Sequence, residues 1–210
     1  MNAWTDSDNW HATKNSLKIA SGLLAGKFGQ TLKRLTWELP QTSLGYTFAA
    51  ILNNIGMVKN VEQFRGATVT SSYKSSIGLG QAITLGSFIT GNNELKAEIN
   101  NYLFMHEYGH YLQSQDAGLF YLINYGLPSI IPYKEHDDKG VEQDANARAI
   151  KFFKKMKGFK GSNFLMNYNV NDYKTVKQCI DNYYYESWYE TLLPIYWIFL
   201  INLYKKNKLL

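Results

Sequence analysis

The segment His106-Glu107-Tyr108-Gly109-His110 places two histidines four residues apart, with a glutamate directly after the first. On a helix this spacing puts the two Cβ atoms about 5–6 Å apart, so both imidazoles can reach one ion. Glu107 lies roughly 100° further round the helix axis, beside such an ion, where a base for a metal-activated water belongs. In a 210-residue chain with 4 histidines, chance produces this pattern about three times in a thousand. The pattern therefore predicts a metal site.

The alternative interpretation is a pair of core histidines on an ordinary amphipathic helix. Gly109 weighs against it, because a glycine inside a helix costs about 1 kcal/mol relative to alanine and needs a packing reason. Close approach of another backbone to this helix would be such a reason. We therefore favour the metal site, in which His106 and His110 are ligands.

A catalytic zinc site needs three protein ligands and one open position. The candidates for the third ligand are His136, Asp137, Asp138, Glu142 and Asp144. Glu142 is preferred, because Asn146 lies four residues later on the same helical face and can reach back to a metal-bound imidazole. Asp144 points about 200° away from Glu142 on such a helix, so both cannot be ligands. His136 stays open as an alternative ligand from a loop.

Apolar spacing predicts helices in the first quarter of the chain. One is expected from Leu17, with a break at Pro40, and a second over 42–54 that ends at Gly56. A helix is also expected from Asn100 or Asn101 to about Gln115, closed by Gly118. A long loop containing Pro128 and Pro132 should follow, then a helix over about 139–157.

Two segments rich in β-branched residues, 67–70 and 80–90, are typical of strands and are expected to pair antiparallel. Helices flanking a small antiparallel sheet give an α+β fold, which we expect to form one domain over residues 1–210. The strand over 82–90 could serve as an edge to which a substrate backbone adds, with Gly86 permitting the approach. The alternative for this strand is an ordinary bulge.

Composition excludes several classes of protein. With 45% apolar and 19% charged residues, the chain is globular rather than disordered. The net charge of +5 is mild, and its lysines are dispersed, so no nucleic-acid partner is expected. The single cysteine, Cys179, excludes a disulfide framework and a cysteine-based zinc site.

Two segments bear on targeting. Residues 1–22 contain no apolar core of a secretory signal, so none is expected. Residues 192–203 form an apolar run that is too short to cross a bilayer, because twelve helical residues span about 18 Å. We expect this run to be a buried core element, with an interfacial anchor as the alternative.

At the motif level the chain resembles a known family. HEYGHYLQSQ at 106–115 and EQDANARA at 142–149 resemble gluzincin-type metallopeptidases. The segments LTWELPQTSLGYTF (35–48), GATVTSS (66–72) and AITLGSFITG (82–91) resemble a domain at the C-termini of bacterial RHS-repeat proteins, where polymorphic toxins carry their effector modules. The resemblance covers roughly residues 12–155. It implies a zincin-like fold, zinc ligands His106, His110 and Glu142, and Glu107 as the base.

One position departs from the family, since Asn146 stands where gluzincins usually have aspartate. The expected function is a zinc-dependent endopeptidase acting on a polypeptide, as an effector module delivered within a larger bacterial protein. An oxyanion-stabilising donor is expected among Tyr133, His136 and Tyr189, with nothing to select one. The alternatives are a non-catalytic zinc-bearing binding module and a membrane-active module that uses residues 192–203.

Overall fold

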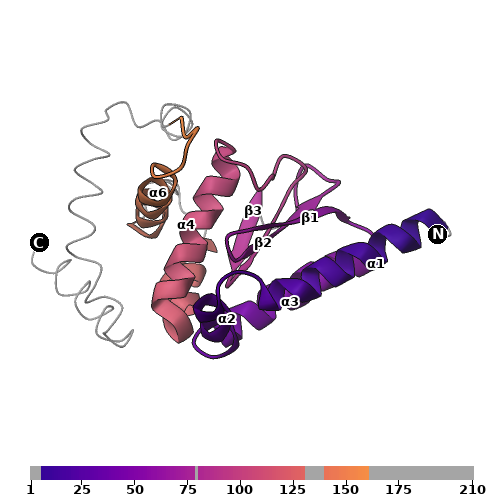
Figure 1. Ribbon diagram of the computed structural model, residues 1–210, viewed down its shortest axis with the longest axis horizontal. Helices are drawn as coiled ribbons and strands as arrows, with labels where there is room; N and C mark the ends of the chain where they lie inside the picture. The colour runs from indigo at the N-terminus through magenta and orange to yellow at the C-terminus, as the bar shows by residue number, and fades with distance from the viewer. Residues whose placement is uncertain (1–5, 79, 131–139, 161–210) are drawn as a thin grey trace, which may run out of the picture.

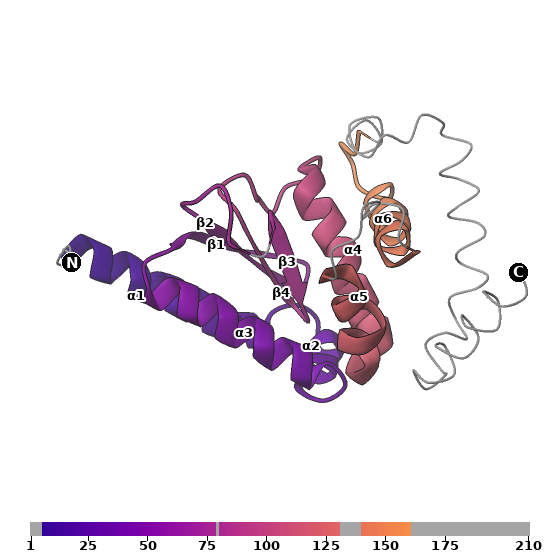
Figure 2. The ribbon, with the colours of Figure 1, turned by 180° about the vertical axis from the view of Figure 1, so that it is seen from behind.

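The computed structural model describes residues 6–78, 80–130 and 140–160. It is an α+β fold in which a four-stranded sheet lies between two layers of helices (Figures 1 and 2). One layer contains α1, α2 and α3, and the other contains α4 and α6. The proposed metal-binding motif is in the second layer.

The first layer contains α1 (Asp6–Ser21), a 3-10 turn (Gly22–Leu24), α2 (Phe28–Leu35) and α3 (Leu39–Asn54). The predicted helix from Leu17 was wrong in its extent, because the chain turns at Gly26, where φ is +93°. Pro40 does not break a helix. It lies in the first turn of α3, where backbone N–H groups have no intrahelical acceptor, so a proline there costs the helix no hydrogen bond. The predicted helix over 42–54 is confirmed.

The sheet contains β1 (Val58–Phe64), β2 (Ala67–Ser72), β3 (Ala82–Leu85) and β4 (Phe88–Gly91), in the order β1-β2-β4-β3. The expectation of an antiparallel sheet was wrong. β4 pairs parallel with β2, and the other two pairings are antiparallel. The predicted strand over 80–90 is a hairpin that turns at Gly86, where φ is +60°, so its second arm lies beside β2 and its first becomes the edge.

Both faces of the sheet are covered. Phe88 packs with Val58 and Val61 towards α1 and α3, whereas Val69 and Ile89 pack towards α4. All of β2 is buried as a result. The edge strand β3 lies next to α4, which brings the predicted substrate edge and the predicted metal ligands into the same region.

The second layer is built on α4 (Tyr102–Ala117), which begins where the Asn101 side chain accepts a hydrogen bond from the backbone N–H of Phe104 and ends at Gly118. Both predicted ends are therefore confirmed. α6 (Gly140–Phe153) packs across α4 and is shorter than predicted. The predicted loop after Gly118 is instead helical as far as Ile130, with a 3-10 turn (Gly118–Phe120), a π-helical turn (Leu122–Gly126) and α5 (Leu127–Ile130).

Several expectations fall on residues outside those described, namely the roles of Tyr133, His136 and Tyr189, the single cysteine Cys179, and the apolar run over 192–203. Across the described residues, no helix combines the length and the apolar character needed to cross a membrane.

Candidate metal centre

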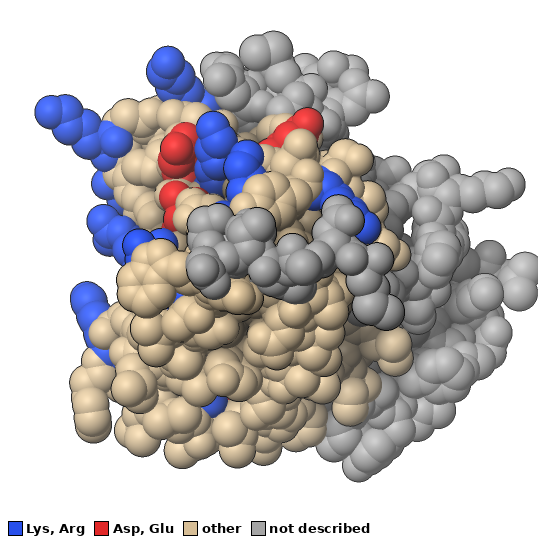
Figure 3. Space-filling model, turned by 90° about the vertical axis from the view of Figure 1, so that its right-hand side faces the viewer, with Lys and Arg blue, Asp and Glu red and all other residues tan. Residues whose placement is uncertain are grey.

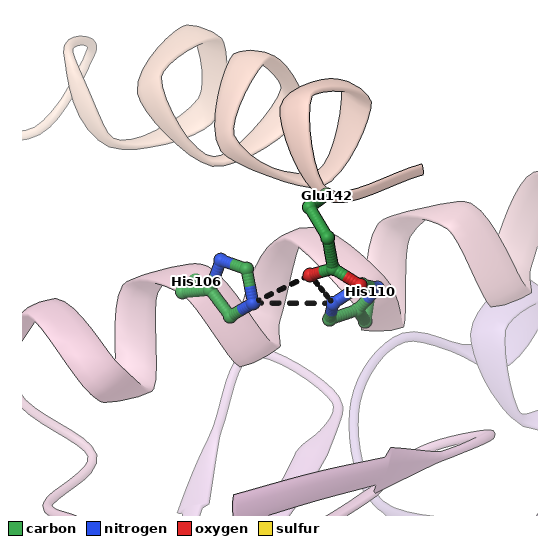
Figure 4. Close-up of side chains that lie close together, drawn as sticks. All are labelled: His106, His110 and Glu142. Atoms are coloured by element: carbon green, nitrogen blue, oxygen red, sulfur yellow. Dashed lines mark hydrogen bonds and ion pairs between the residues drawn. The ribbon is translucent and has the colours of Figure 1, made fainter. Parts of the chain in front are cut away.

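The backbone of α6 crosses α4 directly over Gly109. A Cβ atom at position 109 would overlap the carbonyl group of Ala145. This is the close backbone approach that the mid-helix glycine suggested. It brings the first turn of α6, which carries Glu142, onto the face of α4 that carries His106 and His110 (Figure 4).

Three side chains meet at this crossing. The Glu142 Oε2 atom lies 3.1 Å from the Nε2 atoms of both His106 and His110, and the two Nε2 atoms are 3.2 Å apart (Figure 4). Ligands held tetrahedrally about 2.0–2.1 Å from zinc would be about 3.3 Å from one another. All three residues are buried. The described residues thus include a buried cluster with the spacing of a three-ligand metal site.

The outer nitrogen of each histidine is hydrogen-bonded. Nδ1 of His106 donates to Oδ1 of Asn146, and Nδ1 of His110 donates to Oε1 of Gln113, both over 2.8 Å. The other ring nitrogen, Nε2, then faces Glu142 in both histidines. Without a metal it can carry a proton and donate to the carboxylate, and once that proton is lost its lone pair can bind a metal.

The orientation of the Gln113 amide is fixed by its other partners. Its Nε2 donates to the backbone oxygen of Val141 and to Oδ2 of Asp144, so its oxygen must face His110. Asp144 in turn binds Arg148, which also pairs with Asp116. Asp144 is therefore part of the support of His110 and is outside the ligand cluster.

The electrostatics of the cluster favour a cation. Burial would raise the pKa of Glu142, but its hydrogen bonds to His106 and His110 hold that pKa well below its usual range. Burial would lower the pKa of His110, but Glu142, and then Glu107, raise it to about 9. The second carboxylate oxygen of Glu142 is buried and has no hydrogen-bond partner among the residues that the structure describes. A divalent cation would balance this carboxylate, and the donor set of two imidazoles and one carboxylate suits zinc.

Glu107 is held by the edge strand. The Thr84 hydroxyl lies 2.7 Å from Oε2 of Glu107 and 3.0 Å from its backbone oxygen, and both residues are buried. A hydroxyl has one proton, and the carboxylate is the nearer and charged acceptor. Thr84 therefore connects the edge of the sheet to the carboxylate.

A cavity of about 820 Å³ opens beside these groups. Its lining includes His106, Glu107, His110 and Glu142, the edge strand, and apolar residues after Gly118. Tyr121 closes one side, and its hydroxyl donates to the backbone oxygen of Thr84 over 3.1 Å. Burial, together with the charges of Glu107 and Glu142, raises the pKa of Tyr121, so it remains a hydrogen-bond donor.

Only part of β3 is open at its outer edge. The backbone N–H of Asn92 donates to the oxygen of Gln81, so residues 81, 83 and 85 bond to β4 and Ala82 and Thr84 face outward. The outward oxygen of Thr84 is taken by Tyr121. The backbone groups of Ala82 and the N–H of Thr84 face the cavity side.

Sequence reasoning missed Gln113, Thr84 and Tyr121. The contact of Gln113 with His110 could have been predicted, because Gln113 lies three residues after His110 on the same helical face. Thr84 lies 23 residues from Glu107, and no local pattern connects them. Tyr121 falls in the segment that was predicted to be a loop.

No family model, curated protein or solved structure matches this chain.

Proposed function

We propose that this chain is a zinc-dependent endopeptidase of the gluzincin type. Its zinc ligands would be His106, His110 and Glu142, and Glu107 would be the general base. The proposal rests above all on one observation, the meeting of three buried ligand atoms 3.1–3.2 Å apart with Glu107 in the adjoining cavity wall. A purely structural zinc site would have four protein ligands and no use for this carboxylate.

Bound zinc would supply a Lewis acid that polarises a scissile carbonyl and acidifies a water. Glu107 would accept a proton from the attacking water and return it to the leaving amine nitrogen. Thr84 would hold the Glu107 carboxylate towards the cavity while this proton moves. Tyr121 would offer a neutral donor at the cavity wall for the oxygen on which negative charge develops, once its single hydroxyl proton turned away from the backbone oxygen of Thr84.

The cavity and the strand edge support a polypeptide substrate. An extended segment can pair with the outward groups of Ala82 and with the N–H of Thr84. Apolar side chains from both cavity walls, including Ile83, Leu122 and Ile123, would surround its side chains. Because the backbone oxygen of Thr84 already accepts a hydrogen bond from Tyr121, this pairing is limited to a short stretch unless Tyr121 moves.

The test is the Glu107→Gln variant of the full chain, which keeps the size and polarity of the side chain and removes the base. Zinc content measured by elemental analysis should equal that of the wild type. Cleavage of a panel of folded and unfolded polypeptides should fall 10²–10⁴-fold, as expected for loss of a general base.

Glu94→Gln is the matched control, because Glu94 is an exposed glutamate outside the cavity lining. It should keep full activity. Equal cleavage by the wild type and Glu107→Gln would remove Glu107 from the proposed role. A zinc-loaded wild type that cleaves nothing in the panel would favour a non-catalytic zinc module.

A further inference from the structure

An apolar stripe lies along the outer face of α2. Phe28, Leu32 and Leu35 recur every three or four residues along α2 and are 84%, 53% and 45% exposed. Leu24, in the 3-10 turn that precedes α2, is 68% exposed. In a helix of a globular protein the apolar stripe normally faces the core. Here it faces solvent.

The inward side of the same segment is polar. Arg34, Glu38 and Gln41 are at most 1% exposed. Arg34 donates to the backbone oxygens of Leu23, Ala25 and Gly66. Gln41 and Glu38 bond to the end of α4, through Gly118 and Ser114. These hydrogen bonds fix the orientation of the segment, so the apolar stripe is held outward by the fold.

The exposed charged side chains within residues 9–61 are basic. From residue 9 to residue 61 the sequence contains a single acidic residue, Glu38, and it is buried. The same stretch carries exposed lysines, which are Lys14, Lys18, Lys27, Lys33 and Lys59. Figure 3 views the molecule from the end at which α1 begins, and its lower part, where this helical layer lies, shows a few Lys or Arg side chains and no Asp or Glu.

Two tryptophans are exposed on the same layer. Trp10 is 61% exposed, with the Lys14 ammonium 5.0 Å from its ring centre, and Trp37 is 41% exposed next to Gly118. Tryptophan, leucine and phenylalanine accompanied by lysine are the composition of protein surfaces that lie in the lipid headgroup region.

We propose that this face of the protein, centred on Leu24, Phe28, Leu32 and Leu35, docks on the surface of an anionic lipid bilayer. The apolar side chains enter the boundary between headgroups and acyl chains, and the lysines contact the lipid phosphates. A second copy of the same face is a poor partner, because pairing would bring lysines against lysines with no exposed acid in residues 9–61 to neutralise them. The inference does not depend on the zinc chemistry proposed above.

The experiment is flotation of the purified full chain with two kinds of vesicle. One is neutral phosphatidylcholine, and the other also contains about one third of the anionic lipid phosphatidylglycerol, whose negative surface potential attracts lysines. The wild type should float with the anionic vesicles, less at high salt, and at least tenfold less with the neutral ones. Phe28→Ser combined with Leu32→Ser should lose at least tenfold of the binding to anionic vesicles. Both side chains are exposed, so the fold should survive, as far-ultraviolet circular dichroism would report.

Tyr73→Ser is the matched control, since Tyr73 is 58% exposed on the loop after β2. It should bind vesicles like the wild type. Three results would overturn the proposal: no binding of the wild type to anionic vesicles, unchanged binding by the double variant, or equal binding to neutral vesicles. Concentration-dependent dimerisation that the double variant abolishes would assign the face to a second copy instead.

Discussion

Thr84 and Glu107 form the contact between the edge strand and the helix that carries the metal-binding motif. A hydrogen bond to a charged group contributes about 1.5–3 kcal/mol. Most of that energy is lost if the hydroxyl is replaced by a methyl group of the same size. Because the carboxylate is the proposed base, its orientation should affect the chemical step more than substrate binding.

Thr84→Val should therefore lower kcat about tenfold or more, while KM and zinc content stay close to those of the wild type. Thr84→Ser keeps the hydroxyl and should recover most of the activity. Steady-state kinetics on a cleaved polypeptide, with zinc measured in parallel, would check this. Full activity of Thr84→Val would show that Glu107 is held without it.

A second prediction at the residue scale separates ligands from their supports. Glu142→Ala should lose zinc as completely as His110→Ala, because each removes one of three ligands. Asp144→Asn should keep stoichiometric zinc, because Asp144 contacts Gln113 and Arg148 and lies outside the cluster. Elemental analysis after dialysis measures the difference. Zinc retained by Glu142→Ala would place the third ligand elsewhere, with His136 the first residue to test.

At the scale of elements, the crossing of α4 and α6 decides whether the ligands meet. Gly109 is the contact point, and any side chain there would displace the backbone of α6 at Ala145. Ala145, Ala149 and Phe153 are fully buried on the same side of α6 and hold the helix in place. A displacement of α6 carries Glu142 with it.

Gly109→Ala should consequently weaken zinc binding at least tenfold and lower the thermal midpoint, even though alanine is the better helix former. Competition with a chelating dye would measure the affinity. Gly29→Ala provides the comparison, because Gly29 lies in α2 with nothing within 4 Å of an added Cβ. It should be neutral or stabilising by up to about 1 kcal/mol. Unchanged zinc affinity in Gly109→Ala would mean that α6 tolerates the shift.

At the scale of the whole molecule, zinc should stabilise the fold by binding the native state alone. At a free zinc concentration 100 times its dissociation constant, the gain is about 2.7 kcal/mol. For a chain of this size that corresponds to a rise of about 5–10 °C in the thermal midpoint. A variant with both His106→Ala and His110→Ala should show no such shift. Scanning calorimetry with zinc and with chelator would check this, and an equal shift in the double variant would assign the effect to other residues.

The sequence determined the local features of this protein. The spacing of His106 and His110, the cap at Asn101 and the end at Gly118 are set within one helix, so they could be read without the fold. Helical periodicity also led to the preference for Glu142 as third ligand, with Asn146 four residues later on the same face. In the structure Asn146 is hydrogen-bonded to His106. The apolar spacing of residues 24–35 also predicted a helix, but it did not indicate which way the apolar side chains face.

Only the tertiary structure decided how these elements meet. The hairpin at Gly86 made the sheet mixed and put β3 at its edge, because β4 pairs with β2 through residues that lie 20 positions apart in the sequence. The same arrangement brings the Thr84 hydroxyl to the Glu107 carboxylate and the Tyr121 hydroxyl to the backbone oxygen of Thr84. The stripe on α2 faces outward because Arg34, Glu38 and Gln41 find partners inside. Periodicity shows that a helix has an apolar face, whereas long-range packing and hydrogen bonding decide which way that face points.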